Sequence, residues 1–109
     1  MKPDAKIPEN RDKLRRQITT REGEPLWVVI YKKSSGKQGV TYRDVVEEAI
    51  CFGLIDTITK TVDADTYAIC LRRRKAKSNW TEANFEIARR MVEQGKMTPE
   101  GMGSLPDTM

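Results

Sequence analysis

The feature that most constrains the fold is an apolar stretch of six residues, Leu26 to Tyr31, which lies between two polar segments. Its β-branched and aromatic side chains and the turn residues on each side are typical of a β-strand. Every position is apolar rather than every second one, so we expect other elements to cover both faces of this strand. The rest of the chain must therefore provide helices or strands that pack against it.

Two amphipathic helices are predicted downstream of this strand. Thr41 begins the first, Asp44 is placed to complete a capping box, and Gly53 ends the helix. From residue 42, apolar side chains recur at positions 0, 3, 4, 7 and 8, which form one face of a helix. The charged residues 43, 44, 47 and 48 take the other face. The second helix follows Thr81 and has a broad apolar face.

Residues 54–61 and 66–72 predict two further strands, joined as a hairpin by a turn at residues 63–65. Short helices are expected at residues 10–20, where Leu14 and Ile18 share one face, and after Thr98, where a proline takes the first helical position. This order predicts an α+β fold, with a small sheet of about three strands covered by two main helices plus short terminal helices.

The length of 109 residues fits a single domain. We expect a basic, partly flexible N-terminal arm over residues 1–22, a folded domain over residues 23–102 and a frayed tail over residues 103–109. No apolar run approaches the ~20 residues that span a membrane, and the N-terminus lacks the apolar core of a secretory signal. We therefore expect a cytoplasmic protein, in which Cys51 and Cys70 are buried free thiols.

Positive charge is concentrated in residues 72–77, which we call the basic run. The formal net charge of the chain is +4, while residues 71–77 alone sum to +5. Guanidinium groups grip phosphate or carboxylate through paired hydrogen bonds, and a neighbouring tryptophan offers a stacking face for a base. The candidate anion-binding and partner-binding residues are Arg72, Arg73, Arg74, Lys75, Lys77 and Trp80.

Two structural interpretations of the basic run compete with binding. The run is also typical of a strand end and loop that solvate the surface, and strand alternation would place Arg72 and Arg74 on the face opposite Arg73. The N-terminal residues 1–21 sum to +4 and enlarge the patch only if the fold brings them to the run. Asp56 closes an apolar segment and is a candidate for a structural ion pair with an arginine of residues 72–74.

Catalytic and metal-binding signals are weak. The segment Lys32 to Lys37 contains a Gly-Lys pair, but Tyr31 stands where a phosphate-binding loop needs its first glycine, so we expect a polar, mobile loop. The chain has no histidine and no nucleophile-elbow, Cys-x-x-Cys or dinucleotide-binding motif. We therefore predict a non-enzymatic protein without a cofactor or metal site.

Several segments match a known family in their order and spacing over about residues 26–102. They are LWVVIYKK (26–33), TY (41–42), EAICFGLID (48–56), DTY (65–67), RR (72–73), SNWT (78–81) with Asn84, and GKMTPEG (95–101). Together they resemble the YdeI/OmpD-associated family, also called bacteriocin-protection proteins. Leu54 and Leu71 stand where that pattern usually has tryptophan and proline. The resemblance implies a bacterial protein with a role in bacteriocin protection or stress response.

These observations predict a non-catalytic binding protein that captures an anionic partner, an acidic protein surface, through the basic run. The first alternative is a nucleic-acid-binding domain that uses residues 72–77 with Trp80, and its binding should weaken steeply with salt. The second is an enzyme that acts on a small anionic metabolite, which would need a closed pocket with a carboxylate such as Asp56 beside a lysine or arginine.

Overall fold

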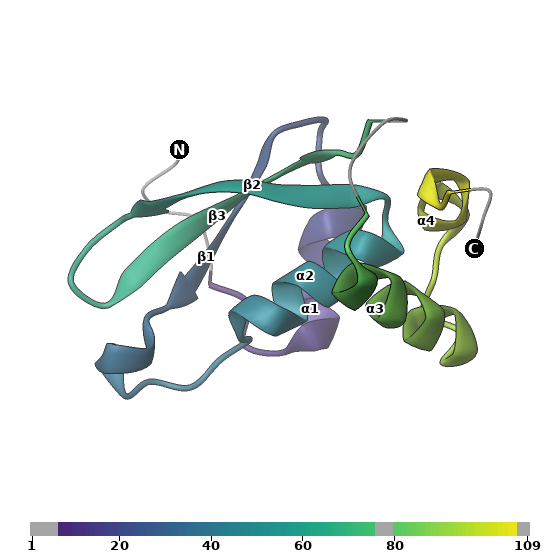
Figure 1. The fold of residues 1–109 in the computed structure, drawn as a ribbon. Coiled ribbons are helices and arrows are strands. Elements are labelled where there is room, and N and C mark those ends of the chain that lie inside the picture. The colour runs from purple at the N-terminus through teal and green to yellow at the C-terminus, as the bar shows by residue number, and fades with distance from the viewer. Residues whose placement is uncertain (1–6, 76–79, 107–109) are drawn as a thin grey trace.

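A three-stranded antiparallel sheet and four α-helices form the protein, as seen in a computed structural model that describes residues 7–75 and 80–106. The elements are α1 (Arg11–Thr19), β1 (Leu26–Tyr31), the 3-10 helix η1 (Lys33–Ser35), α2 (Tyr42–Cys51), β2 (Leu54–Thr61), β3 (Thr66–Arg73), α3 (Glu82–Glu93) and α4 (Pro99–Ser104). Figure 1 shows α1, α2 and α3 together on one side of the sheet. The predicted α+β fold is confirmed.

The sheet has the order β1-β3-β2, so the last strand in the sequence lies at its centre. β1 pairs with β3 from Leu26 opposite Leu71 to Tyr31 opposite Thr66. The predicted β2–β3 hairpin is confirmed, and its turn is held by the Asp63 carboxylate, which accepts hydrogen bonds from the backbone of residues 65 and 66 at 2.9 Å each. An irregularity between Asp56 and Thr59 shifts the β2–β3 register.

The helix α1 belongs to the folded domain. Its two apolar side chains, Leu14 and Ile18, have no exposed surface and lie in the same core cluster as Val28, Val45 and Ile69. Burial of two such side chains contributes about 3–6 kcal/mol relative to leaving them in water. The domain therefore begins before residue 23, where the sequence pattern placed its start, and residues 11–19 are not an arm.

The C-terminal helix α4 docks on the end of α2. The backbone N–H and the hydroxyl of Thr98 both donate to the carbonyl of Cys51, at 3.0 and 2.5 Å. A side chain at Gly101 would collide with that same carbonyl, so only glycine fits there. Because α4 extends to Ser104, the first residues of the expected tail are helical. Cys51 and Cys70 are buried and unbridged, as predicted.

Candidate functional site

The exposed arginines of the basic run do not face one way. Arg72 and Arg73 are both exposed at the end of β3, where they lie opposite Ile55 and Leu54 of β2. Consecutive strand residues point to opposite faces, so these two guanidinium groups diverge. Lys75 is exposed beyond the strand, whereas Lys77 lies outside the described residues.

Arg73 meets the N-terminal region in a shallow pocket of mixed charge. The pocket has a volume of about 320 Å³ and is lined by Arg21, Glu24, Arg73 and Glu100, among others. The backbone N–H of Arg73 donates to the Glu24 carboxylate at 2.5 Å, and Arg21 forms an ion pair with Glu100 at 2.9 Å. The two positive segments therefore touch, but two carboxylates balance the two guanidinium groups at the point of contact.

Two N-terminal arginines, Arg11 and Arg15, are instead paired with buried glutamates in a group of side chains that we call the charge cluster. Its members are Arg11, Arg15, Arg43, Arg90, Glu47 and Glu48. Glu48 is only 2% exposed and receives hydrogen bonds from arginines of α1, including one of 2.8 Å from Arg15. Burial alone would raise the pKa of Glu47, but the hydrogen bonds and charges of the surrounding arginines hold it below its ordinary value.

Arg74 turns inward and is 7% exposed. Its guanidinium carbon lies 4.2 Å from the centroid of the Trp80 ring, and Trp80 stacks on Phe85 with centroids 5.5 Å apart. The backbone N–H of Arg74 donates to the carbonyl of Gly53 at 2.9 Å. This hydrogen bond fixes the backbone of Arg74 beside the turn that follows α2. Burial lowers the pKa of Arg74, and the negative charge of Asp56 partly offsets this effect.

Asp56 does not form the predicted ion pair at contact distance with any described arginine. Its carboxylate instead accepts a hydrogen bond from the hydroxyl of Tyr42, and it acts on Arg74 only through its longer-range charge. Burial and the Asp56 carboxylate raise the pKa of Tyr42 to about 12, because both disfavour the phenolate. Asp56 therefore connects Tyr42 with the buried Arg74.

A larger excess of positive charge than in the pocket at Arg73 lies elsewhere, in a groove of about 780 Å³. The groove is formed by the end of β1, the segment that follows it, the first turn of α2 and one residue of β3. Its lining includes no carboxylate. The charged and aromatic lining residues are Lys32, Lys33, Lys37, Arg43, Tyr31, Tyr42 and Tyr67.

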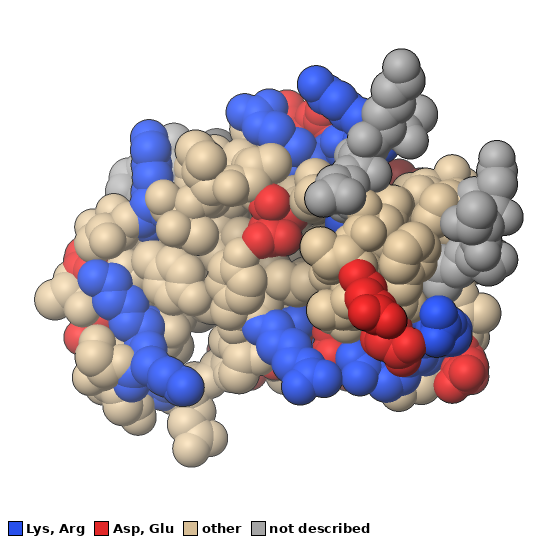
Figure 2. Space-filling view, in the orientation of Figure 1, with Lys and Arg blue, Asp and Glu red and all other residues tan. Residues whose placement is uncertain are grey.

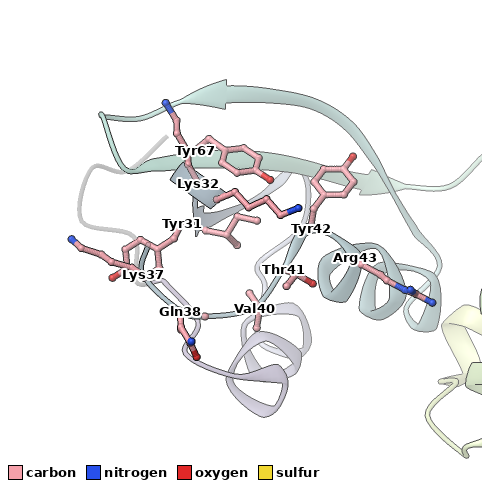
Figure 3. Close-up of a pocket in the computed structure, with 12 residues that line it drawn as sticks. Tyr31, Lys32, Lys37, Gln38, Val40, Thr41, Tyr42, Arg43 and Tyr67 are labelled. Atoms are coloured by element: carbon pink, nitrogen blue, oxygen red, sulfur yellow. The ribbon is translucent and has the colours of Figure 1, made fainter. Parts of the chain in front are cut away.

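The side chains around the groove come from β1, the segment that follows it, α2 and β3 (Figure 3). Tyr42 and Tyr67 lie along the sheet side, Lys32 extends into the space near them, and Lys37 and Arg43 lie at opposite ends. Lys37 is 3.5 Å from the Asp65 carboxylate, and Arg43 is 3.2 Å from Glu47. Within residues 7–75 and 80–106, Lys32 and Lys33 form no ion pair. The groove thus holds two cations without an ion pair beside two tyrosine rings, and the charge of Lys32 also acts at longer range on the carboxylate of Asp63.

Comparison with known proteins gives the family. A family model described as "Domain of unknown function (DUF8412)" matches residues 8–104. The chain belongs to the DUF8412 family. No curated protein and no solved structure matches it. The match begins before α1, in agreement with the burial of that helix in the DUF8412 domain. It provides no link to the YdeI/OmpD-associated family, so that resemblance stays a prediction.

The groove of this DUF8412 domain was not identified from the sequence. The sequence predicts a polar, mobile loop over Lys32 to Lys37, and that prediction does not use the tyrosines on either side. Tyr31 and Tyr42 flank the loop in the sequence, and this pairing of lysine and tyrosine was the available signal. Tyr67 gave no such signal, because only the pairing of β3 with β1 brings it to the loop.

Proposed function

We propose that this DUF8412 domain binds an anionic partner at the groove and acts without catalysis. The observation that carries the proposal is the set of four cations around one groove whose lining has no carboxylate. Three other pockets, at Arg73, at Lys13 and at Arg15, each contain two or more cations and at least one carboxylate. An excess of one charge in a concave surface focuses the electrostatic potential and attracts groups of the opposite charge.

An acidic segment of another protein is the partner that we propose. Lysine ammonium groups on flexible stems pair with carboxylates that are not rigidly spaced. Tyrosine rings provide amphipathic contact area, and such rings are enriched in protein interfaces. Tyr42 is 40% exposed, so part of its ring is available for such contact.

Nucleic acid is the alternative partner, and the distribution of charge argues against it. Figure 2 shows lysine and arginine side chains in separate groups on this face, over the segment after β1, over the helices and near the end of the sheet. A nucleic-acid backbone needs cations along a continuous path. Trp80, the expected stacking residue, already contacts Arg74 and Phe85.

The proposed setting of this binding is the bacterial cytoplasm, with a role in bacteriocin protection or stress response. This setting comes from the resemblance to the YdeI/OmpD-associated family. No helix among the described residues combines the length and apolar character needed to cross a membrane.

A direct binding test uses a fluorescently labelled oligoglutamate peptide and fluorescence anisotropy at low and moderate salt. The double variant Lys32→Gln/Lys33→Gln should weaken binding about tenfold, since two exposed ion pairs of about 0.7 kcal/mol each sum to about 1.4 kcal/mol. The matched control is Lys13→Gln/Arg89→Gln, which removes two exposed cations outside the groove. The control should change the affinity less than twofold.

Two results would contradict the proposal. Equal losses in both double variants would show that only net charge matters, and no detectable peptide binding by the native domain would remove the acidic partner. A single-stranded oligonucleotide provides the comparison ligand. Tighter binding of the oligonucleotide, with a steep salt dependence and loss in the groove variant, would assign the groove to nucleic acid instead.

A further inference from the structure

In the described part of the chain, two buried side-chain nitrogen atoms have no hydrogen-bond partner, and both belong to Arg74. These atoms are Nε and Nη1. A guanidinium group has five N–H donors, one on Nε and two on each terminal nitrogen, so three donors of Arg74 are unpaired. Buried donors are almost always satisfied, and an exception calls for a physical reason such as a ligand that supplies the acceptor.

The surroundings of Arg74 hold the guanidinium without satisfying it. Trp80 contacts the guanidinium carbon through its ring, which stabilises the positive charge but provides no conventional acceptor. Asp56 is the carboxylate whose charge acts on Arg74, but it lies beyond ion-pair distance and is engaged by the hydroxyl of Tyr42. The side chain is therefore oriented and partly desolvated before any ligand arrives, which is the condition for tight anion binding.

We infer that Arg74, backed by Trp80, is a binding site for a carboxylate group of a ligand. A carboxylate supplies acceptor oxygens to one edge of the guanidinium, such as the edge with the unpaired Nε–H, and its single negative charge balances the single positive charge of the guanidinium. Asp56 adds a second negative charge nearby, so a dianionic phosphate group meets more repulsion than a carboxylate does. The charge balance of the site therefore favours the carboxylate.

This site is distinct from the groove, although the two share a wall. Tyr42 lines the groove, and its hydroxyl donates to Asp56 on the side of Arg74. None of the groove-lining cations contributes to the Arg74 site. The inference is therefore independent of the function proposed for the groove.

Trp80 provides the measurement because it contacts the guanidinium group directly. The chain has two tryptophans, so Trp27→Phe leaves Trp80 as the single emitter. In that background we expect acetate to change the emission of Trp80 along a saturable curve, while chloride at equal ionic strength does not. Arg74→Lys keeps the charge but loses the planar fork, and it should weaken the response at least tenfold. The matched control, Arg89→Lys, changes an exposed arginine on α3 and should leave the response unchanged.

A second measurement avoids any dependence on the folding of the variant. In the isotope-labelled native domain, the Nε–H resonance of Arg74 should shift with acetate and reach saturation at the same concentration as the tryptophan signal. Lys32→Gln/Lys33→Gln should not alter either curve, so loss of groove binding is distinguishable from loss of this site.

Three outcomes would overturn the inference. They are an acetate response no different from that of chloride, an undiminished response in a folded Arg74→Lys variant, and an unshifted Nε–H resonance. Inorganic phosphate is the third ligand to be titrated. Saturation by phosphate at a lower concentration than acetate would show that the assignment to carboxylate is wrong.

Discussion

The charge cluster between α1 and α2 and the groove beside β1 each contain four basic side chains, and Arg43 belongs to both. In the cluster, the cations are all arginines and they surround two buried glutamates. In the groove, three of the four are lysines and no carboxylate lines the space. Similar positive charge thus stabilises the fold in one region, whereas in the other two of the four cations, Lys32 and Lys33, form no ion pair among the described residues.

The physical basis of this difference is desolvation. A buried carboxylate such as Glu48 requires partners that remain charged and donate several hydrogen bonds, and arginine meets both requirements. An exposed lysine is well hydrated and gains little from an internal ion pair, so it remains free to exchange water for a ligand. Burial of the carboxylates, rather than the number of basic residues, separates the structural region from the proposed binding region.

The largest expected effect tests the cluster. Glu48→Gln leaves Arg11 and Arg15 without the buried carboxylate that both contact. Because breaking a buried ion pair strands the remaining charge, we expect the free energy of unfolding to fall by about 3 kcal/mol. Urea denaturation measures this, with Glu86→Gln as the control, since Glu86 pairs with Arg89 on the surface and its loss should change stability by less than about 0.5 kcal/mol. Equal effects would mean that the cluster is not structural.

Acid should weaken the cluster before it affects the groove. The arginines hold the pKa of Glu47 below its ordinary value, so its contribution to stability is present above the unfolded pKa of about 4.3 and is lost as pH falls through the lower folded pKa. Glu47→Gln should reduce the slope of unfolding free energy against pH in this acid range by up to about 1.4 kcal/mol per pH unit. Denaturation curves between pH 7 and the acid range measure the slope. An unchanged slope would contradict the assignment.

Arg43 belongs to both the charge cluster and the groove, so its substitution tests the two regions together. Its side chain is 71% exposed and pairs with Glu47 at 3.2 Å, while it also lines the groove. We expect Arg43→Gln to lower the free energy of unfolding by no more than about 0.5 kcal/mol and to weaken binding of the acidic peptide about twofold. If the free energy of unfolding falls while the affinity for the peptide is unchanged, Arg43 acts in the charge cluster alone.

The last test measures a pKa rather than stability and concerns Tyr42 at the edge of the groove. Its pKa is raised to about 12 by burial and by the Asp56 carboxylate. The associated stability is therefore fully present below the ordinary tyrosine pKa of about 10 and is lost as pH rises through the folded value. Asp56→Asn should move the pKa of Tyr42 part of the way back toward 10. Phenolate absorbance, with Tyr42→Phe as the blank, measures the shift, and an unmoved pKa would leave burial as the single cause.

The sequence predicted the elements better than it predicted the sites. Local signals were sufficient for the capped start of α2, the β2–β3 hairpin and the helical register of Leu14 and Ile18, because each depends on near neighbours in the chain. The sequence pattern places Glu47 and Glu48 on the charged face of α2, opposite its apolar face. They are buried because α1 packs over that face and brings arginines to them, which no local pattern in α2 reveals.

The basic run shows the same limit. Strand alternation predicted that Arg72 and Arg74 share a face, but Arg74 is buried against Trp80 while Arg72 is exposed, and this inward turn depends on where α3 begins. The mixed-charge pocket at Arg73 depends on Glu24 and Glu100, which are far away in the sequence. Charge density along a chain therefore predicts the amount of charge more reliably than its availability.

Part of the packing of α1 depends on residues 96–100, which lie far from α1 in the sequence. Arg15 donates to the carbonyl of Lys96 at 2.5 Å, 81 positions away, and Arg21 pairs with Glu100. During synthesis on the ribosome, α1 emerges first, yet these contacts cannot form until residues 96–100 have been translated and released from the exit tunnel. The packing of α1 on α2 is therefore completed by contacts to residues 96–100 that form only late in synthesis, and contacts of such long range are the slow ones in folding.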